Sequence, residues 1–451
     1  VFETVKKKFD LTLSEVSNNK EFKTISSMGD DYVERLTKIV ETGKSPCLPT
    51  FSYQLSKYGF YHNSDLTYIG ARPGMGKCLG KGTKVLMFDG SFKKVEDVLK
   101  GDLLMGDDSH PRKVLSIARG QEKMYWIHQN KAMSYRVNES HILSLKRSRN
   151  ENNKKKGDVL NIEVKEYLTK STKFKSNYKG YKTDIEFKEQ NVTLEPYYLG
   201  LWLGDGDSRN QRISNSDKEI INYLKEYSVR LGAELIEHKS ENRVSNYVIT
   251  NKKNPPKKFR VQSELRVLGV LKNKHIPNHY LINSKENRLQ LLAGLLDTDG
   301  HYDYDSNCFE IVQVRENLAK QIKFICDSLG FRTSLKTKKA SIKSTGFECD
   351  AYRVRIFGNL NEIPTKVERK KARAWASKID WKVTGIKVEY DKIDDYYGFE
   401  IDGNRLFLLE DFTVTHNTAF LISEVRHQSF INNIPVGVFS LEMSAEQLLN
   451  R

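Results

Sequence analysis

The hydrophobic pattern at the two ends of the chain predicts pieces of one α/β unit. Apolar residues recur at helical spacing before position 45, and an apolar strand at 66–69 leads into a glycine-rich turn at 70–77. The far end predicts an amphipathic helix at 418–425 and then a buried strand at 436–441. Strand, turn, helix and strand is a common α/β order, but here the turn and the helix are far apart in the chain.

Between these ends the pattern changes from β to mixed α/β and back again. Alternation at 84–88 and 91–95, around an Asp-Gly turn, predicts a β-hairpin. Residues 146–188 are rich in lysine and turn-forming residues, which favours a linker or a solvated, DNA-facing arm. Residues 192–357 alternate helices with strands, and β patterns then return as far as position 415.

A long apolar helix occurs twice within the mixed α/β stretch. The two helices cover 196–204 and 289–296, and each is followed by an acidic turn that contains glycine, at Asp205 and at Asp299. These turns are 94 positions apart, which predicts two copies of one structural unit. Taken singly, an Asp-Gly pair after an apolar helix is most simply an ordinary helix-ending turn.

Composition narrows the class of protein. The chain has 451 residues, enough for about three domains, and its hydrophobic content of 38% can fill their cores. Its net charge of +16 and its pI near 9.3 favour a nucleic-acid partner over a membrane surface. Because the sequence has no apolar run of membrane-spanning length and no secretory signal, we expect a protein that is neither membrane-bound nor secreted.

The cysteines indicate a reducing compartment. Five of them are scattered along the chain without metal-ligand spacing, which argues against a disulfide framework and against a structural zinc site. We therefore expect a cytoplasmic location or the stroma of a plastid. The cysteines are Cys47, Cys78, Cys308, Cys326 and Cys349.

The glycine-rich turn carries an interrupted phosphate-binding motif. Gly74, Gly76 and Lys77 suit phosphate binding by backbone amides and an ammonium group, but Cys78 stands where a Ser or Thr should hold Mg²⁺. Joining Lys77 to Thr418 restores the motif together with its helix. Chance is the simple alternative, yet the motif is completed in register at both edges. A nucleotide-binding protein that works uncut lacks the helix whose N-terminus should face the phosphate.

The edges of the interrupting segment carry the residue types that protein splicing needs, and residues 78–417 resemble an intein. Cys78 has a thiol that can attack the preceding carbonyl, and Thr418 has a hydroxyl that can accept the acyl group. Asn417 can cyclise through its side-chain amide and release the branch. The resemblance implies that His416 protonates the departing amide or orients the carbonyl.

Two internal residues complete the resemblance to inteins. His141 lies where the family has a His that protonates the scissile amide, and Asn138 replaces the family's usual Thr, where its amide can still donate a hydrogen bond to the Lys77 carbonyl. A lone His is more often an ordinary satisfied polar group. Arg405 stands where the family often has a His, so a DNA-binding endonuclease with a splicing-defective shell is the alternative interpretation.

The repeated helices resemble the two motifs of LAGLIDADG homing endonucleases, and the second reads LAGLLDTDG from position 292. The resemblance implies that the helices pack closely and place Asp205 beside Asp299, where the carboxylates would hold Mg²⁺ for cleavage of double-stranded DNA. Lys274, in a KxIP block, would assist at the first site. The candidates for the matching lysine of the second half are Lys336, Lys338 and Lys339.

Joined across the insertion, the flanking segments resemble a DnaB-type replicative helicase. The resemblance implies ATP as cofactor, DNA as substrate and a homo-hexamer. Lys77 and Thr418 would bind phosphate and Mg²⁺, and Glu442 would orient the attacking water. The full nucleotide-binding set is Ala71, Gly74, Gly76, Lys77 and Thr418. We expect the chain, which runs from Val1 to Arg451, to be a piece of a longer helicase.

The sequence therefore predicts a multidomain protein. Its centre is an all-β Hint splicing domain in two parts, 78–190 and 358–417, the first of which ends in the basic linker. An α+β LAGLIDADG endonuclease of pseudo-twofold αββαββα repeats lies between them at 191–357. Pieces of a RecA-like α/β P-loop ATPase flank the whole at 1–77 and 418–451.

Overall fold

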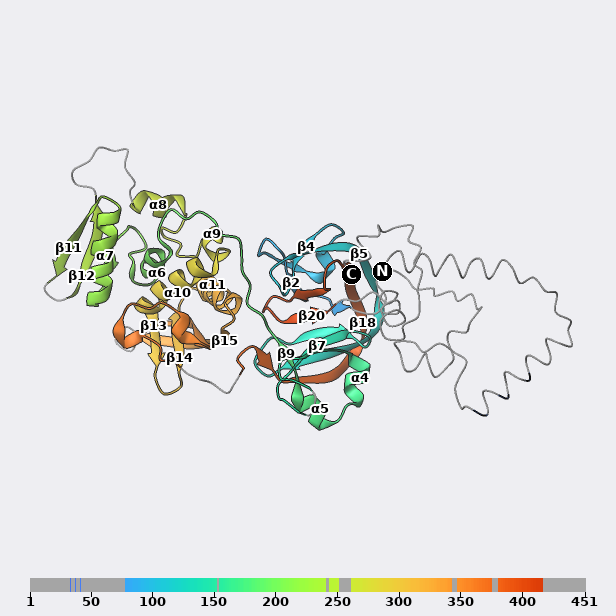
Figure 1. The fold of residues 1–451 in the computed structure, drawn as a ribbon. Helices are drawn as coiled ribbons and strands as arrows, with labels where there is room; N and C mark the ends of the chain where they lie inside the picture. Colours follow the sequence, from blue (N-terminus) through green and yellow to red (C-terminus); the bar gives the residue numbers. More distant parts are fainter. Residues whose placement is uncertain are drawn as a thin grey trace, which may run out of the picture. The chain divides into compact units, whose positions relative to one another are not determined.

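In the computed structural model, residues 78–416 belong to one compact unit (Figure 1). The structure describes residues 78–151, 154–240, 243–250, 261–342, 347–374 and 380–416, and also positions 33, 37 and 41, whose backbone is helical. The strands, turn and helix predicted for the two flanks, and with them the RecA-like pieces, lie outside the described residues. Every described helix is too short or too polar to span a lipid bilayer.

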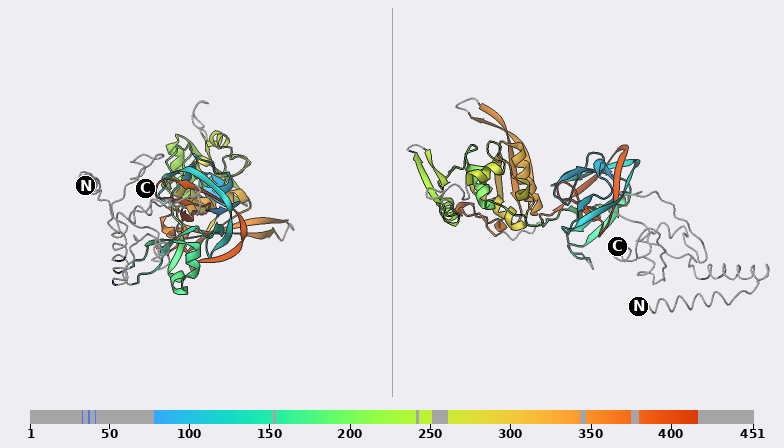
Figure 2. Two further views of the ribbon diagram at one scale, coloured as in Figure 1. Left: turned by 90° about the vertical axis from the view of Figure 1, so that its right-hand side faces the viewer. Right: turned by 90° about the horizontal axis from the view of Figure 1, so that it is seen from above.

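Two long strands from opposite sides of the insertion form the frame of a β domain. β5 (Pro111–Gln129) and β18 (Ile386–Ile401) pair antiparallel, with Arg119 opposite Tyr397. The orange-red ribbon of β18 follows the teal ribbon of β5 (Figure 2). The sheet order is β18-β1-β6-β5-β4, with β1 (Leu79–Gly80), β4 (Leu103–Met105) and β6 (Tyr135–Asn138). Residues from before and after the insertion therefore share one sheet.

Two β-hairpins accompany this sheet, and both confirm predictions from the sequence. β2 (Lys84–Leu86) pairs with β3 (Phe92–Lys94), which a short 3-10 turn, η1 (Val95–Asp97), follows. β19 (Leu406–Leu408) pairs with β20 (Val414–His416), so the last described residues of the chain form the closing hairpin.

Residues 146–188 are largely folded, so their interpretation as a linker or solvated arm is wrong for most of their length. Tyr167 is buried, and Phe174 packs against the same apolar cluster. Lys170 lies over the ring of Phe174 and Lys175 over the ring of Tyr167. The pattern hid this core because a few aromatic residues supply it and lysine stems cover them. The elements are β7 (Ile142–Arg147), β8 (Val159–Glu163), α4 (Val164–Thr169), α5 (Thr172–Asn177), β9 (Tyr178–Tyr181) and β17 (Val383–Thr384).

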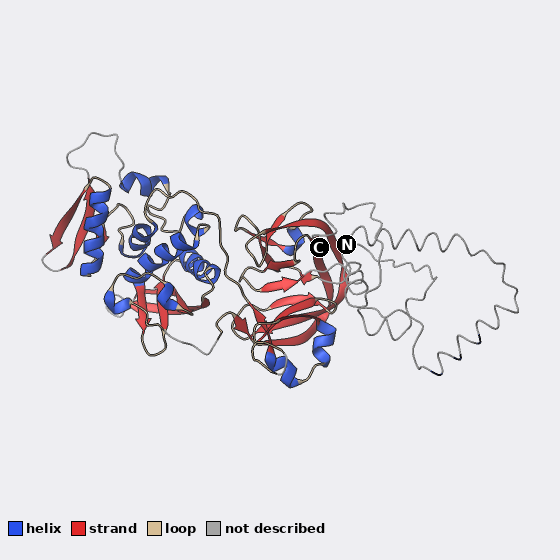
Figure 3. Ribbon diagram, viewed as in Figure 1, coloured by secondary structure: helices blue, strands red, loops and turns tan. Residues whose placement is uncertain are grey.

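Between β9 and β17 the chain folds as a repeat of helices and strands (Figure 3). The first half contains α6 (Pro196–Asp205), β10 (Ile213–Ser214), α7 (Lys218–Arg230), β11 (Glu234–Ser240), β12 (Arg243–Thr250), α8 (Val261–Val267) and α9 (Asn278–Leu281). The second half contains α10 (Lys285–Asp299), β13 (Gly300–Asp303), β14 (Cys308–Gln313), α11 (Glu316–Ser328), β15 (Arg332–Ile342) and β16 (Phe347–Phe357). Two 3-10 turns, η2 (Leu360–Glu362) and η3 (Glu368–Lys370), follow.

The two halves correspond strand by strand. Gly206 bridges Ile213 in the first half, as Gly300 pairs with Ile311 in the second. The sheet orders are β10-β12-β11 and β13-β14-β16-β15, so the bridge at Gly206 takes the place of β13. The predicted fold class is confirmed for the described residues: an all-β domain with an inserted, repeated α+β unit. The domain boundaries drawn from the sequence stay predictions.

Candidate splicing and endonuclease sites

Cys78, the predicted first nucleophile, is fully buried at the start of β1. The next residue, Leu79, pairs with Val137 of β6 on one side and with Tyr397 of β18 on the other. The Cys78 side chain packs in a small cluster with Met124 and Tyr396. The thiol is therefore held inside the sheet, where strands from both parts of the β domain meet.

Asn138 binds the nitrogen of the predicted scissile peptide bond. The Cys78 N–H donates to Asn138 Oδ1 at 3.0 Å, and the Asn138 N–H donates to the Cys78 carbonyl at 3.2 Å. The Asn138 Nδ2 donates in turn to Glu122 Oε2 at 2.7 Å. The sequence assigned this amide to donate to the Lys77 carbonyl, and Lys77 lies outside the described residues. The geometry favours a different role, in which the amide oxygen accepts from the scissile nitrogen.

His141 lies between the two ends of the predicted intein. The side chain is 1% exposed, and its Nε2 lies 2.8 Å from the hydroxyl oxygen of Thr415, on β20. The His141 backbone N–H donates to the Asn138 carbonyl at 3.1 Å. The sequence did not single out Thr415, although a Thr two residues before Asn417 is a polar residue in an otherwise apolar closing strand. His141 is thus tied to the Asn138 turn on one side and to the closing strand on the other.

The remaining splicing residues lie at the edge of the described chain. His416 ends β20, opposite Leu406. Asn417 and Thr418 lie outside the described residues, so their predicted roles stay predictions. The structure brings Cys78, Asn138 and His141 to the strand that ends one residue before Asn417.

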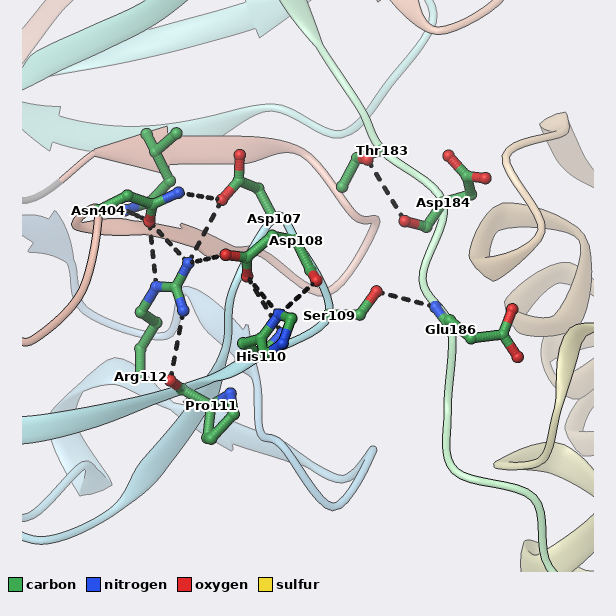
Figure 4. A network of polar contacts seen from close by, with 11 residues as sticks. Asp107, Asp108, Ser109, His110, Pro111, Arg112, Thr183, Asp184, Glu186 and Asn404 are labelled. Carbon is green, nitrogen blue, oxygen red and sulfur yellow. Dashed lines mark hydrogen bonds and ion pairs between the residues drawn. The ribbon is translucent and has the colours of Figure 1, made fainter.

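Arg405, which stands where related inteins often have a His, lies in the turn that leads into β19. Its φ of 65° is in the left-handed region. The preceding Asn404 accepts from the guanidinium of Arg112, which is 4% exposed, at 3.0 Å from Nε and 2.8 Å from Nη2 (Figure 4). Arg112 also donates to Asp108 at 2.7 Å. This turn is therefore anchored by a buried guanidinium next to the position of the absent His.

The endonuclease site begins with two helices in backbone contact. α6 and α10 carry mostly buried residues and lie in one apolar core. A Cβ added to Gly204 would lie 2.0 Å from the Thr298 hydroxyl oxygen, so only glycine fits at this end of α6. The C-terminal ends of the two helices are therefore side by side.

Asp205 and Asp299 are the last residues of these helices, as the repeat predicted. Asp205 accepts from Asn215 at 2.7 Å and Asp299 from Gln313 at 2.6 Å, so the two carboxylates are held by equivalent strands. Burial raises the pKa of Asp205, the Asn215 hydrogen bond opposes this, and the negative charge of Asp299 raises it further. Two carboxylates that repel in a buried place suit a divalent cation.

Lys274 lies at the end of α6. Its Nζ donates to the Gly204 carbonyl at 2.8 Å. Burial lowers the pKa of Lys274 to about 8, although the negative charge of Asp299 opposes this effect. The predicted position of Lys274 at the first carboxylate is therefore one where the ammonium group is poorly solvated and its charge is easily changed.

Lys370, which the sequence did not single out, is the counterpart of Lys274 in the second half. Its Nζ donates to the carbonyls of Leu296, Asp297 and Thr298 at 3.0, 2.8 and 2.8 Å, and burial lowers its pKa. The equivalent of Gly204 in the repeat is Thr298, so both lysines bind the same turn of their helices.

The three lysines proposed from the sequence for the second half are on β15 and exposed, and Lys339 forms an ion pair with Asp350 at 2.8 Å. Their choice was wrong because the lysine comes from the segment after β16. The Ile363-Pro364 pair that precedes Lys370 was the available signal, since the first half has an Ile-Pro pair beside Lys274.

Asp297 anchors the segment that carries Lys370. Its fully buried carboxylate accepts from the Tyr197 hydroxyl at 2.6 Å and from the backbone N–H groups of Lys366 and Val367 at 2.6 and 3.3 Å. In the described part of the chain, no group of three or more His, Cys, Asp or Glu side chains suited to a metal ion occurs. A cation at the helix ends would therefore rely on Asp205 and Asp299.

Comparison with known families agrees with both sites. A family model described as Hom_end-associated Hint matches residues 78–203. A second, described as Homing endonuclease, matches residues 275–377. Together they cover the strands around Cys78 and the helix that ends at Asp299.

Similar proteins include two curated relatives. Replicative DNA helicase DnaB of Mycobacterium intracellulare is 29% identical over 279 residues, covering 59% of this chain and 42% of the relative. The catalytic polypeptide of the V-type proton ATPase of Candida tropicalis is 22% identical over 522 residues, covering 83% of this chain and 46% of the relative. This chain thus spans less than half of the length of these relatives.

Among solved structures, a variant of the homing endonuclease I-DmoI aligns with a TM-score of 0.26 and 14% identity, over 36% of this chain and 87% of that chain. From the two family matches and the helicase relative, the central segment is an intein of the homing-endonuclease-associated Hint family that carries a homing endonuclease, in a chain related to the replicative DNA helicase DnaB.

Proposed function

We propose that residues 78–417 excise themselves and join Lys77 to Thr418. In the first step the Cys78 sulfur attacks the Lys77 carbonyl carbon, so a C–S bond forms and the C–N bond to Cys78 breaks. The thiol proton ends on the departing nitrogen. The observation that carries this proposal is the hydrogen bond of 3.0 Å between the Cys78 N–H and Asn138, because it holds the leaving nitrogen inside the site.

His141 is the proton donor to that nitrogen in this scheme. Its contact of 2.8 Å with Thr415 restrains the ring, and its backbone bond to Asn138 places it beside the residue that grips the nitrogen. A restrained imidazole near a leaving group is suited to general acid catalysis.

The later steps use the C-terminal junction. The Thr418 hydroxyl oxygen attacks the thioester carbonyl, which forms an ester and returns the proton to the Cys78 sulfur. The Asn417 side-chain nitrogen then attacks its own backbone carbonyl, the Asn417–Thr418 peptide bond breaks, and His416 protonates the released Thr418 nitrogen. That nitrogen finally takes the acyl group from the hydroxyl, which leaves an ordinary peptide bond.

Mass spectrometry of the freshly expressed chain tests the splicing proposal. We expect a 340-residue product that spans 78–417 and a 111-residue product that joins 1–77 to 418–451. Added thiol should intercept the thioester and release residues 1–77. Recovery of full-length chain alone, with cleavage at the DNA site intact, would instead support an endonuclease in a splicing-defective shell.

We further propose that the inserted domain cleaves double-stranded DNA with Mg²⁺ held by Asp205 and Asp299. The cation would supply charge stabilisation for hydrolysis of a phosphodiester. The support is the pair of equivalent hydrogen bonds that hold the two carboxylates, together with Lys274 and Lys370 on the same helix turns. These two ammonium groups would hold the phosphate and balance its developing charge.

Cleavage of the helicase gene that lacks the insertion tests this second proposal. Asp205→Asn and Asp299→Asn should abolish double-strand cleavage and leave splicing unchanged, while DNA binding persists and weakens with added salt. Calorimetric Mg²⁺ titration of each variant gives a readout besides activity, and we expect weaker binding in both. Undiminished cleavage would exclude these residues from the site.

For the flanking segments we propose the role of a replicative helicase that assembles as a homo-hexamer after splicing. Lys77 and Thr418 would bind the phosphates and Mg²⁺ of ATP, with Ala71, Gly74 and Gly76 in the same loop; Glu442 would orient the attacking water. All of these residues lie outside the described residues, and the support is the motif that splicing restores. We expect the spliced, full-length helicase to bind ATP and the unspliced form to bind it far more weakly.

A further inference from the structure

The amide of Asn138 connects a carboxylate to the scissile nitrogen. Its Nδ2 donates to Glu122 at 2.7 Å and its Oδ1 accepts from the Cys78 N–H at 3.0 Å. We propose that Glu122 is a positioning residue for the first step of splicing, which acts on the leaving nitrogen through Asn138. This inference rests on the splicing function proposed above.

The partners of Asn138 leave its amide one orientation. A carboxylate only accepts hydrogen bonds and a backbone N–H only donates them. If the amide were turned over, its NH₂ would face the Cys78 N–H and its oxygen would face the Glu122 carboxylate. Both contacts would be repulsive, and Asn138 is fully buried, so no water could relieve them. Glu122 therefore determines that an acceptor faces the scissile nitrogen.

The strand register makes this contact a designed feature of the sheet. Met124 pairs with Asn138 across β5 and β6, and the Glu139 N–H continues the ladder to the Lys123 carbonyl at 3.1 Å. Glu122 is two residues before Met124 and therefore points to the same face of the sheet. The half-buried Glu122 can thus reach the buried amide without a change of backbone.

The charge of Glu122 matters most as the C–N bond breaks. The leaving nitrogen then gains a proton and positive charge. A carboxylate behind the amide polarises it, which makes Oδ1 more negative and strengthens its bond to that nitrogen. The grip on the N–H also directs the nitrogen lone pair away from Asn138, toward the side from which a proton can arrive. Both effects grow toward the transition state, so they accelerate the step.

Thiol-induced release of residues 1–77 measures this step in an Asn417→Ala background. We expect Glu122→Gln, which keeps a neutral hydrogen bond, to slow release about tenfold, and Glu122→Ala to slow it further. Glu139→Gln is the matched control, since it removes a neighbouring negative charge while the structure describes no bond from that carboxylate to Asn138. We expect an unchanged rate for it. C-terminal cleavage in a Cys78→Ala background should be the same with Glu122 or Gln, which shows that the fold is intact.

A double-mutant cycle separates positioning from general stabilisation. In an Asn138→Ala background the connection is already broken, so Glu122→Gln should cause no further loss. An equal loss in both backgrounds, an equal loss of C-terminal cleavage, or an unchanged rate for Glu122→Gln in a chain that otherwise splices would each overturn this inference alone. Absence of thiol-induced release from the parent chain would overturn the splicing proposal and this inference with it.

Discussion

Gly200 and Gly294 face each other across the pseudo-twofold axis of the endonuclease domain. A Cβ built on either glycine would lie 3.0 Å from the other's Cα. The same added atom would lie 2.3 Å from the Leu291 carbonyl oxygen for Gly200, and 2.2 Å from the Tyr197 carbonyl oxygen for Gly294. Two backbones can approach this closely only where neither carries a side chain. The contact brings the two helix ends, and hence Asp205 and Asp299, together.

Gly294→Ala should damage the endonuclease site without changing its residues. The new methyl group meets backbone rather than a mobile side chain, so the helices must separate, at a cost of about 1 to 3 kcal/mol. We expect a lower melting temperature and strongly reduced DNA cleavage. Gln290→Ala, on the same helix, is the control and should leave both measurements unchanged. Normal cleavage by Gly294→Ala would show that the helix contact does not position the carboxylates.

Lys370→Met should reduce the rate of DNA cleavage as strongly as Lys274→Met, because each removes the ammonium group on its own helix end. Lys336→Met should weaken DNA binding slightly and leave the rate of the bound complex unchanged, since Lys336 is exposed on β15. Single-turnover cleavage at saturating enzyme separates the two effects. A normal rate for Lys370→Met would disprove the assignment.

Asp297→Asn should act through Lys370. The amide can accept one backbone N–H but cannot replace the charge that binds the Tyr197 hydroxyl and the N–H groups of Lys366 and Val367. We expect slower cleavage in Asp297→Asn and no additional loss when Lys370→Met is combined with it. Additive losses would mean that Asp297 works independently of Lys370.

Thr415→Val should slow cleavage at Lys77, because it removes the hydroxyl that holds His141 while keeping the shape of the side chain. We expect a loss of about tenfold. Thr415→Ser should restore the rate. His141→Ala should suppress cleavage at Lys77 more strongly, whereas Asn417→Ala should block release of the C-terminal segment and leave thiol-induced cleavage. The rates come from gel or mass-spectrometric time courses, and equal effects of all variants on both junctions would refute the assigned roles.

Asp411 should make the β domain sensitive to acid. Burial alone would raise its pKa, but the nearby Lys182, 3.1 Å away, and the Met133 N–H lower it below the ordinary value of 3.8. A carboxylate with a depressed pKa in the folded state stabilises the fold above its unfolded pKa and loses this effect as the pH falls. We expect the urea midpoint to be constant at neutral pH and to fall below about pH 4.

Asp411→Asn is the test of that dependence. In a non-splicing Cys78→Ala, Asn417→Ala background, it should lower the free energy of unfolding at pH 6 by about 1 to 3 kcal/mol and flatten the acid dependence. An unchanged dependence on pH would show that other carboxylates control acid unfolding.

The sequence predicted those residues whose identity is dictated by covalent chemistry or by an internal repeat. Cys78 stands at a broken motif, and Asp205 and Asp299 end two copies of the same helix, so position along the chain was enough. Glu122 and Thr415 act through contacts that depend on which residues face each other across paired strands. A change of register by one residue would reverse their direction, and no local pattern reveals that register.

Lys370 and the folded segment at 146–188 were missed for a related reason. Lys370 reaches its helix end only because Asp297 binds the chain four residues earlier, a contact between distant parts of the sequence. In the basic segment, Tyr167 and Phe174 fill an apolar cluster while lysines dominate the composition. Average polarity conceals a core when a few large rings supply it.

The pairing of β5 with β18 also sets a schedule. During synthesis β5 is complete at Gln129, but its partner ends only at Ile401, after the whole endonuclease. At roughly 5 to 20 residues per second, the ribosome needs roughly 15 to 55 seconds to make the intervening chain. Throughout that interval Cys78 lacks the strand that encloses it, and Thr415 has not yet been made. The insertion thus delays the first bond exchange until its own coding sequence has been read in full.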